Sequence, residues 1–473
     1  MPITVKTHRS PVVEAAASLL ERQILQRCGK DSLNTAAGDV NLVLAVQPDI
    51  GKEGYSIANT EAGVIRIAGN DERGLLYGVG KFLRTSRYTG GIFTPGSWRG
   101  TSVPEKDIRG IYFATHFFNY YHRAPIESVE RYIEELALWG CNALGVLFAM
   151  HHYTGIDDTR ARDMLDSQRA FCRAANRAGI SPALFLIANE AYSTSPEALR
   201  ASAHGAYGVE LCPSKPGAVD LMLKWREEVF AEFADAGIGY VCLWPHDQGG
   251  CECPQCSPWG GNGFLRISEP VARLARRYFP GVKVILSTWW FDTHQTGEWA
   301  GISKVFEKRP DWVDILMADS DKGKFPAYPL THGSPGGLPM LTFPEISMYG
   351  TYPWGGWGAN PLPRLLQGIW ESARDRTGGG FAYSEGNFED LNKVLMLQWY
   401  WDSKRDPMDT MREYCAFEFS PEAAGELARA AELMEKNNAH KWVVDDTTKQ
   451  RIAKVAHADI AAEVEACVTR AET

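Results

Sequence analysis

The sequence lacks the features that mark membrane, secreted and nucleic-acid-binding proteins. No uninterrupted apolar run of about 18 residues occurs, so we expect no membrane-spanning helix. Residues 1–6 do not lead into the apolar core of a secretory signal peptide, which favours a cytoplasmic location. The formal net charge is -9 and no basic stripe stands out, which argues against a nucleic-acid partner.

Cysteine is too sparse for a fold stapled by disulfides. The chain has 10 cysteines among 473 residues, and most lie alone inside apolar runs, as Cys141, Cys172 and Cys242 do. Such residues are typical of small buried hydrophobes in a reducing compartment. Internal repeats are also missing, and no glycine-rich phosphate loop follows the first strand of the alternating pattern described below. The missing loop disfavours a doubly wound nucleotide-binding sheet.

The N-terminal part of the chain has the pattern of a small α/β unit. The expected elements are a helix, three strands and a second helix, at residues 9–28, 40–46, 54–57, 64–68 and 70–83. We therefore predict a small α/β domain over residues 1–90. A stretch rich in Gly, Pro and Ser, residues 89–104, is expected to link this domain to the rest of the chain.

From residue 107 onward, apolar runs alternate with helical patterns. The expected strands are 108–116, 143–150, 183–188, 240–245, 282–288, 313–318, 340–344 and 380–384. The expected helices between them are 126–139, 159–178, 218–236, 264–278 and 362–377. This alternation predicts an α/β fold with a closed parallel (β/α)8 barrel (TIM barrel) over residues 105–402. A helical C-terminal region, residues 403–473, is expected to follow, with helices at 408–417, 421–437 and 447–470.

Polar and aromatic side chains follow nearly every predicted barrel strand. Residues at the carboxyl ends of barrel strands face the substrate, so a dense set of them is typical of an enzyme mouth. The predicted substrate-binding residues are His116, His151, His152, Asn189, Glu190, His246, Trp289, Trp290, Asp292, Tyr349, Trp354 and Tyr383. Adjacent strand residues point oppositely, so only one residue of the Trp289-Trp290 pair is expected to face the substrate. The same holds for the His151-His152 pair.

Three carboxyl groups are the predicted catalytic residues. Glycoside hydrolysis needs a carboxylic acid for the leaving oxygen and a second group at the sugar's reacting carbon. Asp247 and Glu345 follow the fourth and seventh strands and are expected to face each other across the mouth. The apolar residues 243–245 could keep Asp247 protonated. Glu385, after the eighth strand, is the third candidate, either as a base or as a hydrogen-bond acceptor for sugar hydroxyls.

Cys251, Cys253 and Cys256 form a Cys-x-Cys-x-x-Cys string directly after Asp247. They could supply three of the four ligands of a structural zinc ion, with His246 or an undefined residue as the fourth. A loop disulfide or three free thiols are the alternatives. Under each of these alternatives, the cysteine string is expected to shape the loop that presents Asp247. Catalysis itself is expected to need no cofactor.

Several of these motifs resemble known glycoside hydrolases. Residues 54–57 and 68–78 resemble the small domain that precedes the barrel in family 20 hexosaminidases and family 67 and 115 alpha-glucuronidases. Residues 247–256 are similar to a string in uncharacterised and endo-hexosaminidase-type relatives, and residues 383–393 to a strand-eight signature of glucuronidase-like members. The resemblance covers residues 1 to about 435. It implies a glycoside hydrolase acting on a carbohydrate substrate.

The chain departs from the family 20 pattern at one position. Those enzymes carry an Asp-Glu pair after strand four, whereas the matching residues here are Asp247 and Gln248. Because Gln cannot act as a carboxylic acid, the acid would be Asp247 itself, Glu190 or Glu345. An alpha-glucuronidase would also need a basic residue for the sugar carboxylate. Basic residues in loops that could reach it are Arg123, Lys215, Lys322 and Lys324.

The leading hypothesis is an exo-acting glycoside hydrolase that acts on an oligosaccharide or glycoconjugate. A non-hydrolytic, carbohydrate-binding barrel is the second hypothesis, since Gln248 replaces an acid. The third is a metal-dependent sugar isomerase or lyase, with ligands drawn from His116, His151, His152, His246 and Asp247. The oligomeric state is left open.

Overall fold

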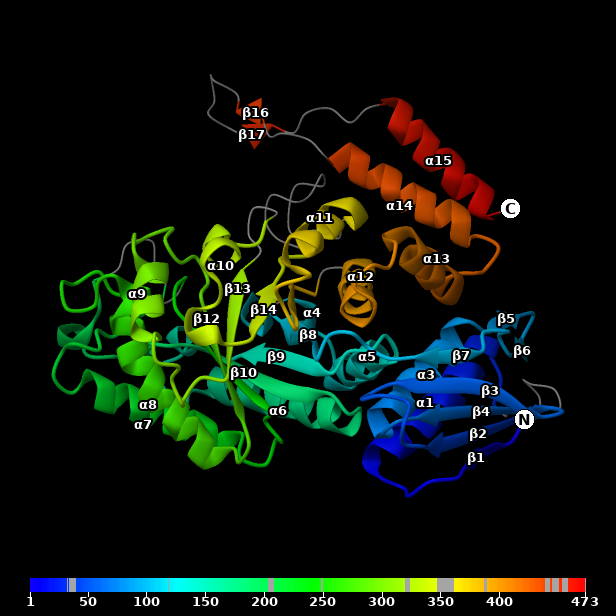
Figure 1. Ribbon diagram of the computed structural model, residues 1–473, viewed down its shortest axis with the longest axis horizontal. Helices are drawn as coiled ribbons and strands as arrows, with labels where there is room; N and C mark the ends of the chain where they lie inside the picture. The colour runs from blue at the N-terminus through cyan, green and yellow to red at the C-terminus, as the bar shows by residue number, and fades with distance from the viewer. Residues whose placement is uncertain are drawn as a thin grey trace.

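The computed structural model describes residues 1–473 apart from residues 32, 34–39, 118, 203–207, 248–249, 320–323, 347–360, 387–388, 439–442, 445–450, 453–457 and 473. Figure 1 shows an N-terminal α/β unit beside a barrel, with the last helices of the chain packed above them. Among the described residues, no helix has both the length and the apolar character needed to cross a bilayer.

The N-terminal unit is built on a five-stranded sheet in the described part of the chain, with the order β1-β2-β4-β3-β7. Its strands are β1 (Ile3–Val5), β2 (Asn41–Val46), β3 (Tyr55–Glu61), β4 (Val64–Gly69) and β7 (Gly100–Ser102). β1, β2 and β4 are parallel, and β3 is antiparallel to both of its neighbours. β7 lies within the stretch expected to be a linker, so part of that stretch is an edge strand. A small hairpin of β5 (Arg87–Thr89) and β6 (Ile92–Thr94) precedes it.

Two capped helices cover this sheet, α1 (Pro11–Cys28) and α3 (Glu72–Arg84). The Ser10 hydroxyl accepts a hydrogen bond from the Val13 N–H at 3.3 Å, and Gly29, with φ of 60°, ends α1 in the left-handed conformation. At the start of α3, the Asp71 carboxylate accepts from the N–H of Gly74 at 2.9 Å. It also accepts from the N–H of Glu53 at 2.7 Å, which ties α3 to the turn before β3.

The eight predicted barrel strands are confirmed, and in the described residues they form a closed parallel barrel. They are β8 (Ile108–Phe113), β9 (Ala143–Leu147), β10 (Ser181–Ile187), β11 (Tyr240–Trp244), β12 (Lys283–Ser287), β13 (Ile315–Asp319), β14 (Met340–Phe343) and β15 (Gly379–Ser384). Closure is between β15 and β8. There Gly379 has a φ of 108°, and a Cβ would lie 1.8 Å from the Ile108 carbonyl oxygen. Only glycine allows the two strands to meet at this point.

Helices surround the barrel and continue past its last strand. They are α4 (Tyr120–Arg123), α5 (Ile126–Leu138), α6 (Thr159–Arg177), α7 (Ala218–Glu232), α8 (Gly263–Tyr278), α9 (Glu298–Val305), α10 (Ala327–His332), α11 (Pro363–Ala373), α12 (Asp390–Trp401), α13 (Pro407–Glu418), α14 (Ala424–Asn438) and α15 (Ala458–Glu472). The short 3-10 helices are η1 (Thr115–Phe117), η2 (Met150–His152), η3 (Glu197–Leu199), η4 (Trp259–Gly261) and η6 (Pro335–Gly337). The helix expected at 447–470 begins later, at Ala458, because β16 (Val443–Val444) and β17 (Arg451–Ile452) form a small hairpin before it.

Aromatic rings fill the barrel interior beneath its carboxyl end. The ring centroids of Tyr112 and Phe185 lie 4.7 Å apart, and those of Trp244 and Phe343 lie 4.8 Å apart. The rings of Phe343 and Tyr383 are 5.8 Å apart. These buried rings come from β8, β10, β11, β14 and the end of β15, so the barrel is packed through its centre. We call these five residues the aromatic floor.

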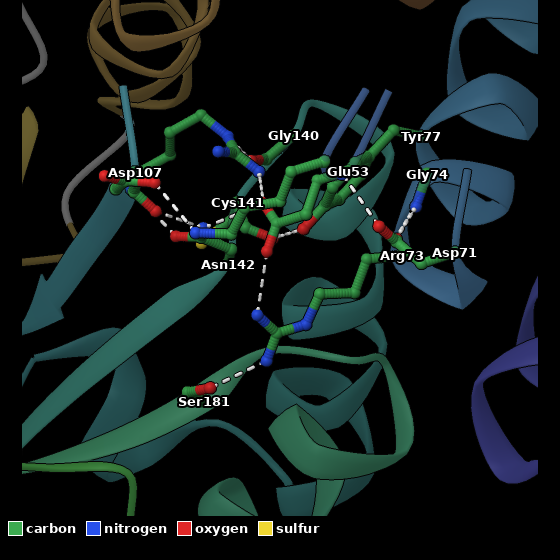
Figure 2. Close-up of polar contacts among 12 residues, drawn as sticks. Glu53, Asp71, Arg73, Gly74, Tyr77, Asp107, Gly140, Cys141, Asn142 and Ser181 are labelled. Carbon is green, nitrogen blue, oxygen red and sulfur yellow. Dashed lines mark hydrogen bonds and ion pairs between the residues drawn. The ribbon is translucent and has the colours of Figure 1, made fainter. Parts of the chain in front are cut away.

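A buried polar network joins the N-terminal unit to the amino end of the barrel (Figure 2). One carboxylate oxygen of Glu53 accepts from Arg109 Nη2 at 2.5 Å and from Asn142 Nδ2 at 3.1 Å. Its other oxygen accepts from Arg73 Nη1 at 2.9 Å, and Arg73 Nη2 reaches Ser181 Oγ at 2.7 Å. Burial alone would raise the pKa of Glu53, but the Arg109 and Arg73 guanidinium groups hold it below its ordinary value.

Candidate active site

The predicted site residues that the structure describes gather at the carboxyl ends of the barrel strands, in three neighbouring groups. The first follows β8 to β10, the second follows β11 and β12, and the third follows β14 and β15. Tyr349 and Trp354 lie outside the described residues, as do Gln248 and Lys322.

The first group is a cluster of histidines and buried carboxyls. His151 donates its backbone N–H to Glu190 Oε1 at 3.2 Å, and its Nδ1 contacts the same oxygen. The rings of His151 and His152 are 4.2 Å apart and steeply inclined to each other. Burial and the neighbouring His152 and His151 lower the pKa of His116 to about 3, so this ring is neutral at physiological pH. Because His151 and His152 contact each other and both lower the pKa of His116, the three histidines form one cluster.

Asn189 and Glu210 complete this first group. The Asn189 side chain donates to the carbonyls of Leu211 at 2.9 Å and Gly250 at 2.8 Å, and accepts from the Gly250 N–H at 2.9 Å. Its amide thus holds two loops together from a fully buried position. Glu210, which sequence reasoning missed, bridges to Glu190 through the backbone. Burial and the Glu190 carboxylate raise the pKa of Glu210 to about 7.

The second group centres on His246 and a carboxylate that sequence reasoning missed, Glu298. Glu298 Oε1 lies 2.7 Å from His246 Nε2 and accepts from the Gly260 N–H at 2.9 Å. Its Oε2 accepts from the Asp292 N–H at 3.0 Å. Glu298 is fully buried at the first residue of α9, so it fixes the orientation of the His246 ring. No local sequence signal marks Glu298. Its role becomes visible only when the pairing of β11 with β12 brings it to His246.

The remaining members of the second group show backbone strain. Asp247, Trp290 and Asp292 have φ of 78°, 57° and 62°, in the left-handed region that non-glycine residues rarely adopt. Asp292 Oδ1 accepts from the N–H groups of Gly297 and Glu298, both at 2.7 Å, and so caps α9. The Trp289 ring is buried and stacks on Trp290, which is half-buried, at 5.6 Å. Of this pair, Trp290 has more surface available for a ligand.

The third group surrounds Tyr383. Its hydroxyl donates to Glu385 Oε1 at 2.7 Å, and its ring stacks on Tyr112 at 5.6 Å. Burial raises the pKa of Glu385 to about 7; the hydrogen bond from Tyr383 opposes this rise and the nearby Glu389 adds to it. Glu345 is half-buried and bridges to Tyr383 through the backbone. Tyr383, Glu385 and Glu345 therefore lie together at the carboxyl ends of the adjacent strands β14 and β15.

The aromatic floor connects the ends of β11 and β14, which are not neighbours in the barrel. Trp244 is three residues before Asp247, and Phe343 is two residues before Glu345. The rings of Trp244 and Phe343 are in contact inside the barrel. The segments that carry Asp247 and Glu345 therefore both begin next to the aromatic floor.

A cluster of four cysteines lies beside the second group. The structure brings Cys212, from the segment between β10 and α7, to the three predicted cysteines, and the four sulfur atoms lie within 4.8 Å of one another. These residues could hold a metal ion. His246, the fourth ligand weighed from sequence, contacts Glu298 instead. Cys212 has no sequence signal, because it stands alone on a different loop.

Comparisons with known proteins identify the fold. No protein-family model matches the chain, and no curated protein sequence matches it. The GH115 4-O-methyl-alpha-glucuronidase BtGH115A is similar over 99% of this chain and 68% of its own, with 14% identity and a TM-score of 0.66. A Streptomyces plicatus beta-hexosaminidase is similar over 90% of this chain and 91% of its own, with 15% identity and a TM-score of 0.57.

A third solved structure is a GH138 enzyme that targets pectin rhamnogalacturonan II. It is similar over 93% of this chain, with 12% identity and a TM-score of 0.62. The chain spans 55% of the length of that GH138 enzyme. At these identities the likeness is one of fold, and it confirms a glycoside-hydrolase-like (β/α)8 barrel with the resemblance to hexosaminidases and alpha-glucuronidases expected from sequence.

Proposed function

We propose that the protein is an exo-acting glycoside hydrolase whose substrate is an oligosaccharide or glycoconjugate. The observation that carries this proposal is Glu385, a buried carboxyl at the barrel mouth that contacts Tyr383 and has its pKa raised to about 7. Such a group still holds its proton near neutral pH. Glycoside hydrolysis needs a carboxylic acid of this kind to protonate the leaving oxygen.

The second carboxylate of the reaction comes from Asp247 or Glu345. Asp247 stands at a strained position at the end of β11, and Glu345 lies beside Tyr383 after β14. One of them attacks the anomeric carbon or activates a water there, while the other binds sugar hydroxyls. Strain at Asp247 supports a functional position, since strained backbone collects at active sites.

Aromatic and imidazole side chains provide the sugar contacts. Trp290 offers a half-buried ring backed by Trp289, and an indole face suits the apolar C–H face of a pyranose. His151 and His152, whose rings lie 4.2 Å apart after β9, provide hydrogen-bonding groups for sugar hydroxyls. The similar folds support the substrate class, since BtGH115A has specificity for decorated arabinogalactans. A Vibrio harveyi protein of similar fold is an exo beta-N-acetylglucosaminidase, which supports the exo mode.

The test is a panel of aryl glycosides, including N-acetylhexosaminides and glucuronides of both anomeric configurations. Wild-type protein is compared with Glu385→Gln, Asp247→Asn and Glu345→Gln. Loss of the acid should lower kcat by about 10²- to 10⁴-fold on substrates with poor leaving groups. The loss should be much smaller for dinitrophenyl glycosides, because their leaving group needs no proton. If wild-type protein cleaves nothing across the panel, the proposal fails.

Three further measurements complete the assignment. Azide should restore turnover to whichever of Asp247→Ala and Glu345→Ala removes a nucleophile, because truncation leaves room for the anion, and the configuration of the first product shows retention or inversion. Glu269→Gln is the matched control, because Glu269 is an exposed carboxylate on α8 that pairs with Arg273. It should retain full activity. Release of single sugars from one end of a labelled oligosaccharide would support exo action, and internal cleavage would contradict it.

A further inference from the structure

The four cysteines beside the barrel mouth form a compact group that the proposed hydrolysis does not use. We call Cys212, Cys251, Cys253 and Cys256 the four-cysteine cluster. Within the described residues, it is the one group of His, Cys, Asp or Glu side chains whose ligand atoms converge tightly enough for a single ion. Cys212, Cys251 and Cys256 are buried, and Cys253 is half-buried.

The sulfur spacing matches a single tetrahedral ion. Cys212 Sγ lies 3.7 Å from Cys253 Sγ and 3.8 Å from Cys256 Sγ. Zinc–sulfur bonds of about 2.3 Å at tetrahedral angles place ligand sulfurs about 3.8 Å apart. A disulfide needs about 2.05 Å. An iron–sulfur cluster holds its thiolates on different iron atoms and therefore spreads them more widely than these four sulfurs are spread.

The surroundings of the four-cysteine cluster suit an anionic zinc–thiolate centre. Ser214 Oγ is 3.0 Å from Cys256 Sγ and can donate its hydroxyl hydrogen to a thiolate there. Arg266 Nη1 donates in turn to Ser214 Oγ at 2.9 Å, which brings a positive charge to the second layer of contacts. Such second-layer donors orient metal ligands and offset their negative charge.

The position of the cluster links it to the active-site loops. Cys212 follows Leu211 and Cys251 follows Gly250, and these are the two residues whose backbones the Asn189 amide holds. Gln295, from the segment after β12, donates to the Cys251 carbonyl at 3.3 Å. An ion bound here would therefore fix the loop after β11 at its base, a few residues beyond the strained backbone of Asp247.

We propose that the four-cysteine cluster binds one Zn²⁺ that ties the loops after β10 and β11 together. Four thiolates complete the coordination of a tetrahedral zinc ion, so the site is structural and has no open position for a substrate. Tetrahedral sulfur ligation selects zinc among the common divalent ions. The zinc ion belongs to the scaffold of the mouth, whether or not the protein hydrolyses glycosides.

The test uses the full chain purified from zinc-supplemented cells without chelator. Elemental analysis should find about one zinc ion per chain in wild-type protein and in the control Cys415→Ser, which alters a buried cysteine on α13. Cys212→Ser and Cys253→Ser should lose most of the zinc and unfold at a lower temperature. Iron in place of zinc, or retention of stoichiometric zinc by Cys212→Ser, would overturn the proposal.

Two measurements on wild-type protein apply even if the serine variants fail to fold. Replacement of zinc by Co²⁺ should produce the strong visible absorption of a tetrahedral tetrathiolate site. Thiol titration of the unfolded protein with chelator present should find all 10 cysteines reduced. A weak octahedral cobalt spectrum, or two missing thiols from a disulfide, would contradict the zinc site. None of these readouts depends on catalysis, so failure of the hydrolase proposal would leave them unchanged.

Discussion

At the two ends of the barrel, the pKa of a buried glutamate is shifted in opposite directions. At the amino end, Glu53 is 6% exposed and its pKa is lowered; at the carboxyl end, Glu385 is 2% exposed and its pKa is raised to about 7. Two guanidinium groups contact Glu53, whereas a tyrosine hydroxyl contacts Glu385. Burial is therefore similar, and the charge of the partners decides the direction of the pKa shift.

This difference separates a charge-paired network at the amino end from carboxyl groups with raised pKa values at the carboxyl end. A carboxylate paired with Arg109 stabilises the folded state in its charged form, and it attaches the N-terminal sheet to the barrel. A carboxyl that resists ionisation destabilises the folded protein above its normal pKa but is suited to proton transfer. The pKa of Glu210 is raised like that of Glu385, by burial and by the neighbouring Glu190 carboxylate. The two ends of the barrel thus hold buried glutamates whose pKa values are shifted in opposite directions.

The largest expected effect is at the amino end. Glu53→Gln should lower the free energy of unfolding by about 3 to 5 kcal/mol, because it leaves the buried Arg109 guanidinium without its counter-charge. Urea unfolding at neutral pH measures this change. Lys52→Gln is the neighbouring control, since the Lys52–Asp107 ion pair is exposed and such pairs contribute about 1 kcal/mol or less. Equal losses in the two variants would show that the network is not structural.

The second expected effect is a pH dependence of opposite sign at the carboxyl end. The pKa of Glu385 rises from 4.5 to about 7 on folding, so the folded state keeps a proton that the unfolded state releases between these values. Wild-type stability from this group therefore falls as pH rises through that window. Glu385→Gln should remove the fall and gain up to about 3 kcal/mol relative to wild type above pH 7.

Urea unfolding of both variants across the pH range checks this contrast. The stability contributed by Glu53, whose pKa is lowered, is present above its unfolded pKa and lost as pH falls through its folded pKa. The difference between wild type and Glu53→Gln should therefore grow as pH rises toward 4.5 and stay constant above that value, whereas Glu385→Gln should gain on wild type between pH 4.5 and about 7. Parallel curves for the two variants would contradict the comparison.

The smallest expected effect concerns the strained second group at the mouth. Asp292→Ala removes the acceptor for the N–H groups of Gly297 and Glu298 and should cost about 1 kcal/mol, as loss of a helix cap does. Calorimetry should show a fall of a few degrees in Tm. Asp163→Ala, on the exposed face of α6, is the control and should leave Tm unchanged. An unchanged Tm for Asp292→Ala would mean that the cap contributes nothing.

Much of the fold followed from local pattern. The eight barrel strands were predictable because strands buried on both faces need continuous apolar runs. Most of these runs were separated by segments whose apolar residues recur with the 3.6-residue period of a helix. The short helices α9 and α10 were missed, since few periodic residues mark so short an element. β7 was missed as well, because a three-residue edge strand has almost no pattern of its own.

The candidate site was only partly predictable. Glu385 and Tyr383 stood out because they follow an apolar strand, yet the raised pKa of Glu385 depends on burial that the sequence does not display. Asn189 looked like a ligand-binding residue, but its amide is directed to Leu211 and Gly250. Which polar groups face one another is set by the closure of the barrel.

The sequence by itself determined which segments form the eight barrel strands and which polar residues follow them, because these depend on short-range periodicity and turn chemistry. Only the tertiary structure decided the partners: Arg109 for Glu53, Glu298 for His246 and Cys212 for the other cysteines of the four-cysteine cluster. Each pair joins segments far apart in the chain, and their meeting depends on strand order and register around the closed barrel.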